Sequence, residues 1–256
     1  DILIELAKHK SLGARVFQAE DEIAGICSAI GASFAGAMAC TSTSGPGLSL
    51  KSEAIGLAVM TELPLVIVDV QRGGPSTGLP TKTEQSDLTQ ALFGRNGEAP
   101  CIVVAASSSA NCFYWAFEAA RLSLETMTPT ILLTDGYLGN GSQLFRIPKM
   151  ADLPKINPPF ATPNDPNYAP YNRDPETLVR QWALPGMDGL RHRIGGLEKL
   201  SGKGSVSTDS ANHQQMVKFR KEKVERVANR IPNQEVEGAE SADLLVVGWG
   251  GTEGAL

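Results

Sequence analysis

The chain has 256 residues and a formal net charge of −5, with 42% hydrophobic and 20% charged residues. These proportions are typical of a globular protein with one large domain or two small ones. There is no clustered run of Lys and Arg, and no apolar run reaches the ~20 residues that span a bilayer. We therefore expect neither a nucleic-acid partner nor a membrane segment.

Four cysteines and three histidines are the residues that could suggest a metal site. The cysteines are Cys27, Cys40, Cys101 and Cys112. They form no Cys-x-x-Cys pair, and the histidines are isolated, so we expect no metal ligands in this chain. Thiols without an evident partner favour a reducing compartment, and we predict a cytoplasmic protein.

Short apolar runs alternate with helical patterns along the first 149 residues. The expected strands are residues 16–17, 36–40, 63–70, 101–105 and 130–134. The expected helices are residues 1–10, a small-residue helix after Glu20, and residues 49–60, 84–93 and 108–126. This alternation predicts an α/β fold with a doubly wound parallel sheet.

The character of the chain changes near residue 150. About half of the 16 prolines lie in residues 150–185, which predicts extended surface chain, and residues 210–230 predict a charged helix with a solvated basic face. Residues 242–251 predict a strand that leads into a glycine turn. We divide the chain into residues 1–149, 150–240 and 241–256, with the last part opening a second α/β domain. The abrupt start and end predict a fragment of a longer subunit.

Two stretches place polar groups where expected strands end. Glu20 lies between a short apolar run and a helix, and residues 41–47 read Thr-Ser-Thr-Ser-Gly-Pro-Gly. Ligands of open α/β sheets bind outside the carboxyl ends of the strands. Glycines let a backbone approach a ligand, and hydroxyls supply adaptable hydrogen bonds. The alternatives are an ordinary helix-start acid and an ordinary turn.

A third stretch follows the most apolar of the expected strands. Residues 71–81 read Gln-Arg-Gly-Gly-Pro-Ser-Thr-Gly-Leu-Pro-Thr. The arginine, Arg72, would give a carboxylate a planar and permanently charged partner. The alternative is a surface arginine in a loop.

These motifs resemble a known family. Gln18-Ala19-Glu20, a helix rich in alanine and glycine, and then Thr-Ser-Gly-Pro-Gly are similar to the pyrimidine-binding domain of thiamine diphosphate enzymes. The segment Arg-Gly-Gly-Pro-Ser-Thr-Gly narrows the resemblance to the alpha subunits of 2-oxoacid:ferredoxin oxidoreductases, in particular the 2-oxoglutarate type. The resemblance is strong over residues 18–135 and weaker to the end of the chain.

The resemblance implies roles for particular residues. Glu20 matches the catalytic glutamate that hydrogen-bonds the N1′ atom of the aminopyrimidine, a role that needs a carboxyl group shielded from water. Arg72 and Thr77 match residues that contact the substrate. The expected cofactor-binding residues are Glu20, Ser42, Thr43, Ser44 and Gly45.

The resemblance also implies a cofactor and partners. Thiamine diphosphate would be shared with a beta subunit that holds its diphosphate, Mg²⁺ and a [4Fe–4S] cluster. The hetero-oligomer would convert a 2-oxoacid and coenzyme A to an acyl-CoA and CO₂, with reduction of ferredoxin; for 2-oxoglutarate the product is succinyl-CoA. A Tyr-Pro-Ile-Thr-Pro segment that contacts substrate in the family has no match here.

Two other readings stay open from the sequence. A non-oxidative thiamine diphosphate decarboxylase or synthase shares the glutamate and the Thr-Ser-Gly-Pro-Gly loop, but lacks the segment that begins at Arg72. A non-catalytic nucleotide-binding or assembly module would not need Glu20. Since Arg72 would recognise a carboxylate that all 2-oxoacids share, the preference for 2-oxoglutarate depends on the resemblance alone.

Overall fold

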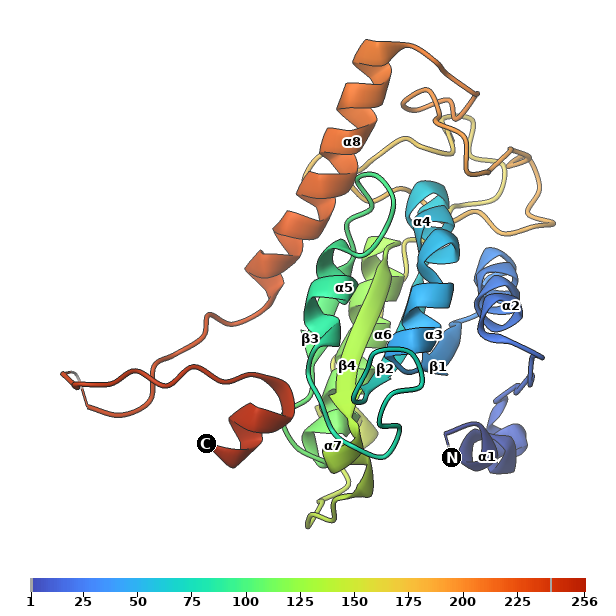
Figure 1. Ribbon diagram of the computed structural model, residues 1–256. Coiled ribbons are helices and arrows are strands. Elements are labelled where there is room, and N and C mark those ends of the chain that lie inside the picture. Colours follow the sequence, from blue (N-terminus) through green and yellow to red (C-terminus); the bar gives the residue numbers. More distant parts are fainter. Residues whose placement is uncertain (1, 240) are drawn as a thin grey trace.

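The centre of the molecule is a parallel sheet of four strands in the order β1-β2-β4-β3 (Figure 1). The computed structural model describes residues 2–239 and 241–256, so Asp1 of the expected first helix lies outside the described residues. The strands are β1 (Cys40–Thr43), β2 (Leu65–Gln71), β3 (Ile102–Ala105) and β4 (Pro129–Asp135). All three neighbouring pairs run parallel.

Helices cover both faces of this sheet (Figure 1). The α-helices are α1 (Ile2–Leu6), α2 (Glu22–Phe34), α3 (Gly45–Leu50), α4 (Ser52–Thr61), α5 (Asp87–Phe93), α6 (Asn111–Thr126), α7 (Gly136–Asn140) and α8 (Ser210–Glu225). Short 3₁₀ helices occupy Ala7–Leu12, Met150–Asp152, Arg226–Arg230 and Gly250–Ala255.

The two faces have separate apolar cores because successive strand residues point to opposite sides. Leu65 and Ile67 of β2 belong to the core formed with α2, α4 and α5. Val66, between them, belongs to the core formed with α6. The prediction of a doubly wound parallel α/β sheet is confirmed.

Helices α2 and α3 begin beside one another next to the end of β1. Asp21 is extended, and its side chain accepts a hydrogen bond from Ala24 N at 2.7 Å, which starts α2. Helix α3 begins after Ser44, with Pro46 in its first turn, where a missing N–H costs nothing. The first turn of α2 touches α3, since a Cβ on Gly47 would lie 2.9 Å from Glu22 Cγ.

Two expected strands are absent from the described part of the chain. Residues 16–17 and 242–251 form no strand, because no neighbouring strand there pairs with their backbones. Val247 is 85% exposed. The strand expected at residues 36–40 forms slightly later, as β1. The helix expected at residues 49–60 begins earlier and is divided at Lys51 into α3 and α4.

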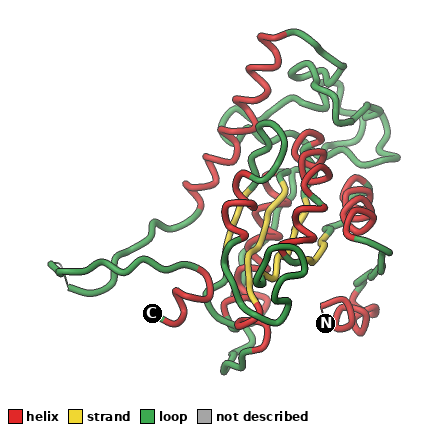
Figure 2. Tube along the Cα trace, in the orientation of Figure 1, coloured by secondary structure: helices red, strands yellow, loops and turns green. Residues whose placement is uncertain are grey.

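The prediction that residues 150–185 are surface chain is wrong at several positions. Apart from the 3₁₀ helix at Met150–Asp152 the segment is mostly loop (Figure 2), but Tyr171, Arg180 and Trp182 are fully buried. Trp182 stacks on Phe160 with ring centroids 5.0 Å apart and packs against Met127 at the end of α6. The segment is therefore anchored to the first part of the chain.

The basic face expected over residues 210–230 is only partly solvated. Arg220 and Lys223 of α8 are each 3% exposed and pair with Glu198 and Glu62. Burial of a charge requires a paired and hydrogen-bonded partner, and both side chains have one. These two residues attach α8 to the rest of the fold.

No helix among residues 2–239 and 241–256 combines the length and apolar character that crossing a membrane requires. The same residues contain no group of three His, Cys, Asp or Glu side chains that could hold a metal ion. All four cysteines are free thiols.

Candidate active site

A cavity of about 430 Å³ lies at the carboxyl end of β2. Its walls come from the start of α3, the loop that follows β2, and the start of α5. The lining residues are Gly45, Pro46, Ser49, Arg72, Gly74, Pro75, Ser76, Glu84, Ser86, Asp87 and Gln90. This is the edge at which open α/β sheets bind ligands. The structure thus brings together the loop at residues 41–47 and the segment that begins at Arg72.

Arg72 lines this cavity and forms no ion pair within the described residues. Its Nε atom is buried and makes no hydrogen bond. The ion pairs that arginines make within the described residues belong to Arg121, Arg173, Arg220, Arg226 and Arg230. Because a buried and unsatisfied charged donor is costly, Arg72 is available to an anion that enters the cavity.

The loop after Arg72 is folded onto itself by backbone hydrogen bonds. Gly73 N donates to Lys82 O at 2.8 Å, and Leu79 N donates to Gly73 O at 2.9 Å. Gly78 has φ +46°, and a Cβ there would collide with Gly73. Thr77 is exposed in this loop and does not line the cavity. The structure therefore brings Arg72 to the cavity wall but leaves Thr77 outside it.

Glu20 is exposed and also lies outside the cavity. Within the described residues its carboxylate makes no hydrogen bond or ion pair, so the described chain does not form the expected dry site around it. The first turn of α2, which follows Glu20, is hydrogen-bonded to a buried lysine. Lys51 is 1% exposed, and its Nζ donates to Glu22 O at 2.7 Å. Burial lowers the pKa of Lys51. The sequence did not indicate a role for Lys51, because a single lysine within an expected helix is usually exposed on the helix surface.

The loop at residues 41–47 combines half-buried hydroxyls with closely packed glycines. Ser42, Thr43 and Ser44 are half-buried, and Gly45 is buried. A Cβ on Gly45 would lie 2.6 Å from Asp87 Oδ1, and one on Gly47 would collide with the Thr43 hydroxyl. These two glycines permit close contact with protein side chains, whereas the sequence had suggested close approach to a ligand.

Beneath the cavity lies a buried pair of carboxyl groups. Asp69 of β2 is 0% exposed, and Asp87, the first residue of α5, is 8% exposed. The two side chains are neighbours, since Asp87 contributes to the shifted pKa of Asp69, and within the described residues both Asp69 oxygens are buried without a hydrogen-bond partner. Burial, followed by the neighbouring Asp87, raises the pKa of Asp69 to about 8. Burial also raises the pKa of Asp87.

Sequence reasoning missed Asp69 and found no role for Asp87. The available signal was an ionisable residue inside the most apolar strand segment, residues 63–70. A carboxyl group in that environment stays neutral or needs a partner. In the structure the neighbour of Asp69 is a second carboxyl group. A proton shared by the two groups would keep one of them neutral and so reduce the cost of burying their charge.

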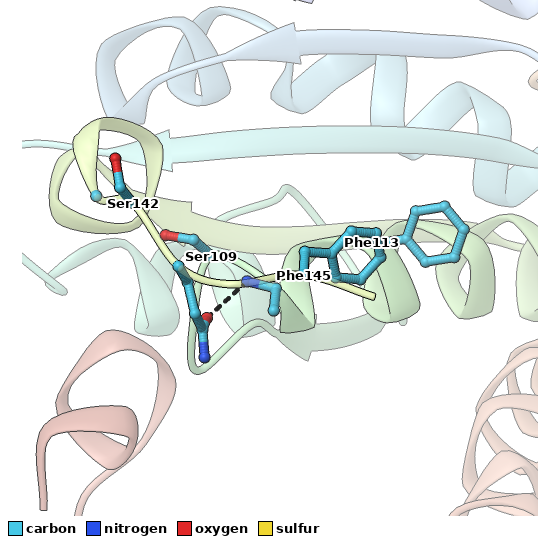
Figure 3. Close-up of a pocket in the computed structure, with 7 residues that line it drawn as sticks. Ser109, Phe113, Ser142 and Phe145 are labelled. Carbon is cyan, nitrogen blue, oxygen red and sulfur yellow. Dashed lines mark hydrogen bonds between the residues drawn. The ribbon is translucent and has the colours of Figure 1, made fainter. Parts of the chain in front are cut away.

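A second cavity of about 330 Å³ lies at the start of α6 (Figure 3). Two of its polar groups are paired within the protein: Ser109 Oγ donates to Leu138 O at 2.8 Å, and Ala110 N donates to Gln143 Oε1 at 2.8 Å. Phe113 and Phe145 form another part of its wall (Figure 3). The cavity contains none of the predicted site residues, and the Arg72 cavity is the better candidate.

The fold and this site define a member of a known enzyme family. Residues 1–209 match the family described as pyruvate flavodoxin/ferredoxin oxidoreductase, thiamine diphosphate-binding, and the chain belongs to it. The family resemblance expected from residues 18–81 is confirmed.

Individual relatives are similar over nearly the whole chain. The 2-oxoglutarate oxidoreductase subunit KorA of Mycobacterium tuberculosis is 56% identical over 257 residues, which cover 100% of this chain and 39% of that protein. The 2-oxoglutarate synthase subunit KorA of Methanothermobacter thermautotrophicus is 36% identical over 93% of this chain and 62% of its own.

A solved structure shows the same fold. It is a 2-oxoglutarate:ferredoxin oxidoreductase from Magnetococcus marinus with 2-oxoglutarate, coenzyme A and succinyl-CoA bound. The TM-score is 0.92 at 39% identity, over 97% of this chain and 43% of that chain. The chain therefore spans less than two thirds of the length of each of these three relatives.

Proposed function

We propose that this chain is the pyrimidine-binding part of the alpha subunit of a 2-oxoglutarate:ferredoxin oxidoreductase. The observation that carries the proposal is the Arg72 side chain, whose Nε has no hydrogen-bond partner within the described residues, in a cavity of about 430 Å³ beside Gly45. A 2-oxoacid has a carboxylate that fits such a partner, and Arg72 would bind it with paired charge-assisted hydrogen bonds. The names of the relatives support 2-oxoglutarate as the substrate.

The residues near the start of α2 fit the proposed cofactor. When bound, thiamine diphosphate supplies the carbanion that attacks the 2-oxo carbon. Glu20, whose carboxylate is exposed and unpaired within the described residues, would share a proton with the pyrimidine N1′ atom. The half-buried hydroxyls of Ser42, Thr43 and Ser44 would line the wall beside the pyrimidine.

The proposed reaction needs partners beyond this chain. In the proposal, a beta subunit covers Glu20 and excludes water from it, and holds the diphosphate, Mg²⁺ and a [4Fe–4S] cluster. 2-Oxoglutarate and coenzyme A give succinyl-CoA and CO₂, and the released electron pair passes through the cluster to ferredoxin. Thr77, which is exposed, would reach the substrate carboxylate only after movement of its loop. We place the enzyme in the cytoplasm because all four cysteines are free thiols.

A viologen assay of the complete protein with its partner subunit tests this function. The assay contains thiamine diphosphate, coenzyme A and, one at a time, 2-oxoglutarate, pyruvate and 2-oxobutyrate. We expect coenzyme A-dependent dye reduction that is fastest with 2-oxoglutarate. Glu20→Gln should lower kcat by ~10²-fold or more, since proton transfer by a positioned group contributes this much.

The control is Glu53→Gln, which changes an exposed carboxylate in the first turn of α4 and should retain full activity. Unchanged dye reduction in Glu20→Gln would remove the catalytic assignment. No reduction with any 2-oxoacid, in a complex whose cluster is intact, would favour a non-oxidative enzyme or a non-catalytic module.

A further inference from the structure

The buried carboxyl pair under the cavity lies between the two motifs that define the site. In the sheet register, Asp69 is opposite Thr43 of β1 and Leu133 of β4. Asp87 begins α5 and is itself part of the cavity wall. The pair therefore lies behind the loop at residues 41–47 and beside the strand end that leads to Arg72.

Asp87 contacts the loop at residues 41–47 and shares the cavity wall with Arg72. The Asp87 carboxyl abuts Gly45, where a Cβ would lie 2.6 and 2.7 Å from its two oxygens. Asp87 and Arg72 line the same cavity. Within the described residues, both Asp69 oxygens and Oδ2 of Asp87 are buried and have no hydrogen-bond partner. A movement of Asp87 would thus displace Gly45 and change the charge that Arg72 faces.

Within residues 2–239 and 241–256, no Lys, Arg or His side chain forms an ion pair with Asp69 or Asp87. Thr43 and Leu133 flank Asp69 within the sheet, and α3 presents Gly45. The nearest charged groups along the chain are Glu84, before α5, and Arg72, after β2; the Glu84 carboxylate acts to raise the pKa of Asp87. Two adjoining carboxylates in a low-dielectric site cannot both ionise without a large cost.

We propose that Asp69 and Asp87 are positioning residues of the 2-oxoacid site, which share one proton and so hold Gly45 and the Arg72 side of the cavity in the arrangement that receives the substrate carboxylate. This inference rests on the proposed function. When the shared proton leaves, the pair gains a second negative charge, so the two carboxylates repel one another and the wall that Arg72 shares becomes more negative. Both effects weaken binding of an anionic substrate.

The pair has a pH signature that a merely structural contact would lack. The raised pKa of Asp69, about 8, puts loss of the proton in the mildly alkaline range. KM for the 2-oxoacid should rise roughly tenfold per pH unit above pH ~8, if only the protonated pair binds substrate. The value of kcat should change less, because neither carboxyl group touches the reacting atoms.

The first experiment detects the proton itself and does not depend on turnover. Infrared spectra of the complete protein, with and without ¹³C-carboxyl aspartate, are compared at pH 7 between wild type and Asp69→Asn. We expect an isotope-sensitive band of a protonated aspartic acid in wild type that is lost in the variant. Absence of such a band in wild type would overturn the shared proton.

The second experiment measures KM and kcat for 2-oxoglutarate against pH. Asp69→Asn replaces the protonated partner with a neutral amide that can still donate to Asp87, so its KM should stay flat where that of wild type rises. Asp87→Asn removes the neighbouring carboxylate but leaves Asp69 buried, so it should move the rise of KM to a lower pH, and it serves if Asp69→Asn does not fold. An alkaline rise of KM that keeps its wild-type position in both variants would overturn the positioning role.

The two experiments separate this inference from the proposed function. A complete protein that turns over no 2-oxoacid would refute the function and the positioning role together, while the infrared band would still decide whether the pair shares a proton. Normal turnover with no band would refute only the pair.

Discussion

Two fully buried carboxyl groups lie near opposite ends of β2, and their environments differ completely. Glu62, before the strand, is 1% exposed and pairs with Arg173 and Lys223; Asp69, near its end, is 0% exposed and has the Asp87 carboxyl group as its ionisable neighbour. Burial acts to raise the pKa of both. At Glu62 the two cations override burial and hold the pKa well below its usual range, whereas the pKa of Asp69 rises to about 8.

The difference between these two carboxyl groups reflects a difference in charge pairing at the two edges of the sheet. At the amino edge the Glu62 carboxylate is paired with two buried cations: Lys223 Nζ donates to Glu62 Oε2 at 2.7 Å and to Met127 O at 3.2 Å, and Arg173 donates to the same carboxylate. At the carboxyl edge charge is left over, as in the unpaired Arg72 and the Asp69 oxygens. The first arrangement joins α4, the proline-rich segment and α8, and the second leaves groups available for chemistry.

The largest effect should come from breaking the amino edge. Glu62→Ala leaves Arg173 and Lys223 buried without a counter-charge, which costs ~3–5 kcal/mol of unfolding free energy. Urea denaturation measures it, with Glu53→Ala as the exposed control that stays within ~0.5 kcal/mol. A loss of under ~1 kcal/mol in Glu62→Ala would mean that the buried network does not hold the segments together.

A smaller effect is expected at the carboxyl edge from Gly45→Ala. The new Cβ would come within 2.6 Å of Asp87 Oδ1, and such overpacking costs ~1–3 kcal/mol. Activity should fall as well, because Asp87 and Arg72 share the cavity wall. Denaturation and dye reduction measured on the same variant check both. A fully active and fully stable Gly45→Ala protein would contradict the close packing.

The opposite protonation of the two carboxyl groups predicts a pH effect on stability. The folded-state pKa of Asp69 lies above its unfolded value, so its contribution is present in acid and is lost as pH rises toward about 8. The slope is at most ~1.4 kcal/mol per pH unit. Asp69→Asn should flatten the fall of the unfolding temperature between about pH 5 and 8. An unchanged slope in the variant would show that another group titrates.

The smallest effect belongs to a glycine outside both edges. Gly56 lies in α4, and no atom lies within 4 Å of the position that a Cβ would occupy, so Gly56→Ala should stabilise the protein by ~0.5–1 kcal/mol through helix propensity. Gly56→Ala is the matched control for Gly45→Ala, because it makes the same substitution where there is space for the new Cβ. A destabilised Gly56→Ala protein would show that this face of α4 is covered in the complete assembly.

Much of the sheet and part of the site follow from the sequence. The apolar run around β2 and the glycine-rich stretch after it indicate a buried strand with a ligand loop at its carboxyl end, and the structure puts Arg72 there. Local patterns suffice in this case, because a strand end and the loop that follows it are adjacent in the chain. The same local logic does not predict strand pairing, and it failed at residues 242–251.

Contacts between distant segments could not be predicted. The partner of Asp69 is 18 positions further along the chain, and the ion pair between Glu62 and Lys223 joins residues that are 161 positions apart. The buried Trp182 lies in a proline-rich stretch whose composition is that of a loop. Each depends on tertiary packing, which composition and periodicity do not report.

The most direct test of the 2-oxoacid site is the KM for 2-oxoglutarate of Arg72→Gln in the complete protein, beside the exposed control Arg191→Gln. Losing the charged, bidentate partner should lower kcat/KM by roughly 30- to 1,000-fold, equivalent to ~2–4 kcal/mol, while Arg191→Gln stays near wild type. That result would make the cavity at the carboxyl end of β2 the 2-oxoacid site. An unchanged kcat/KM in Arg72→Gln would contradict it.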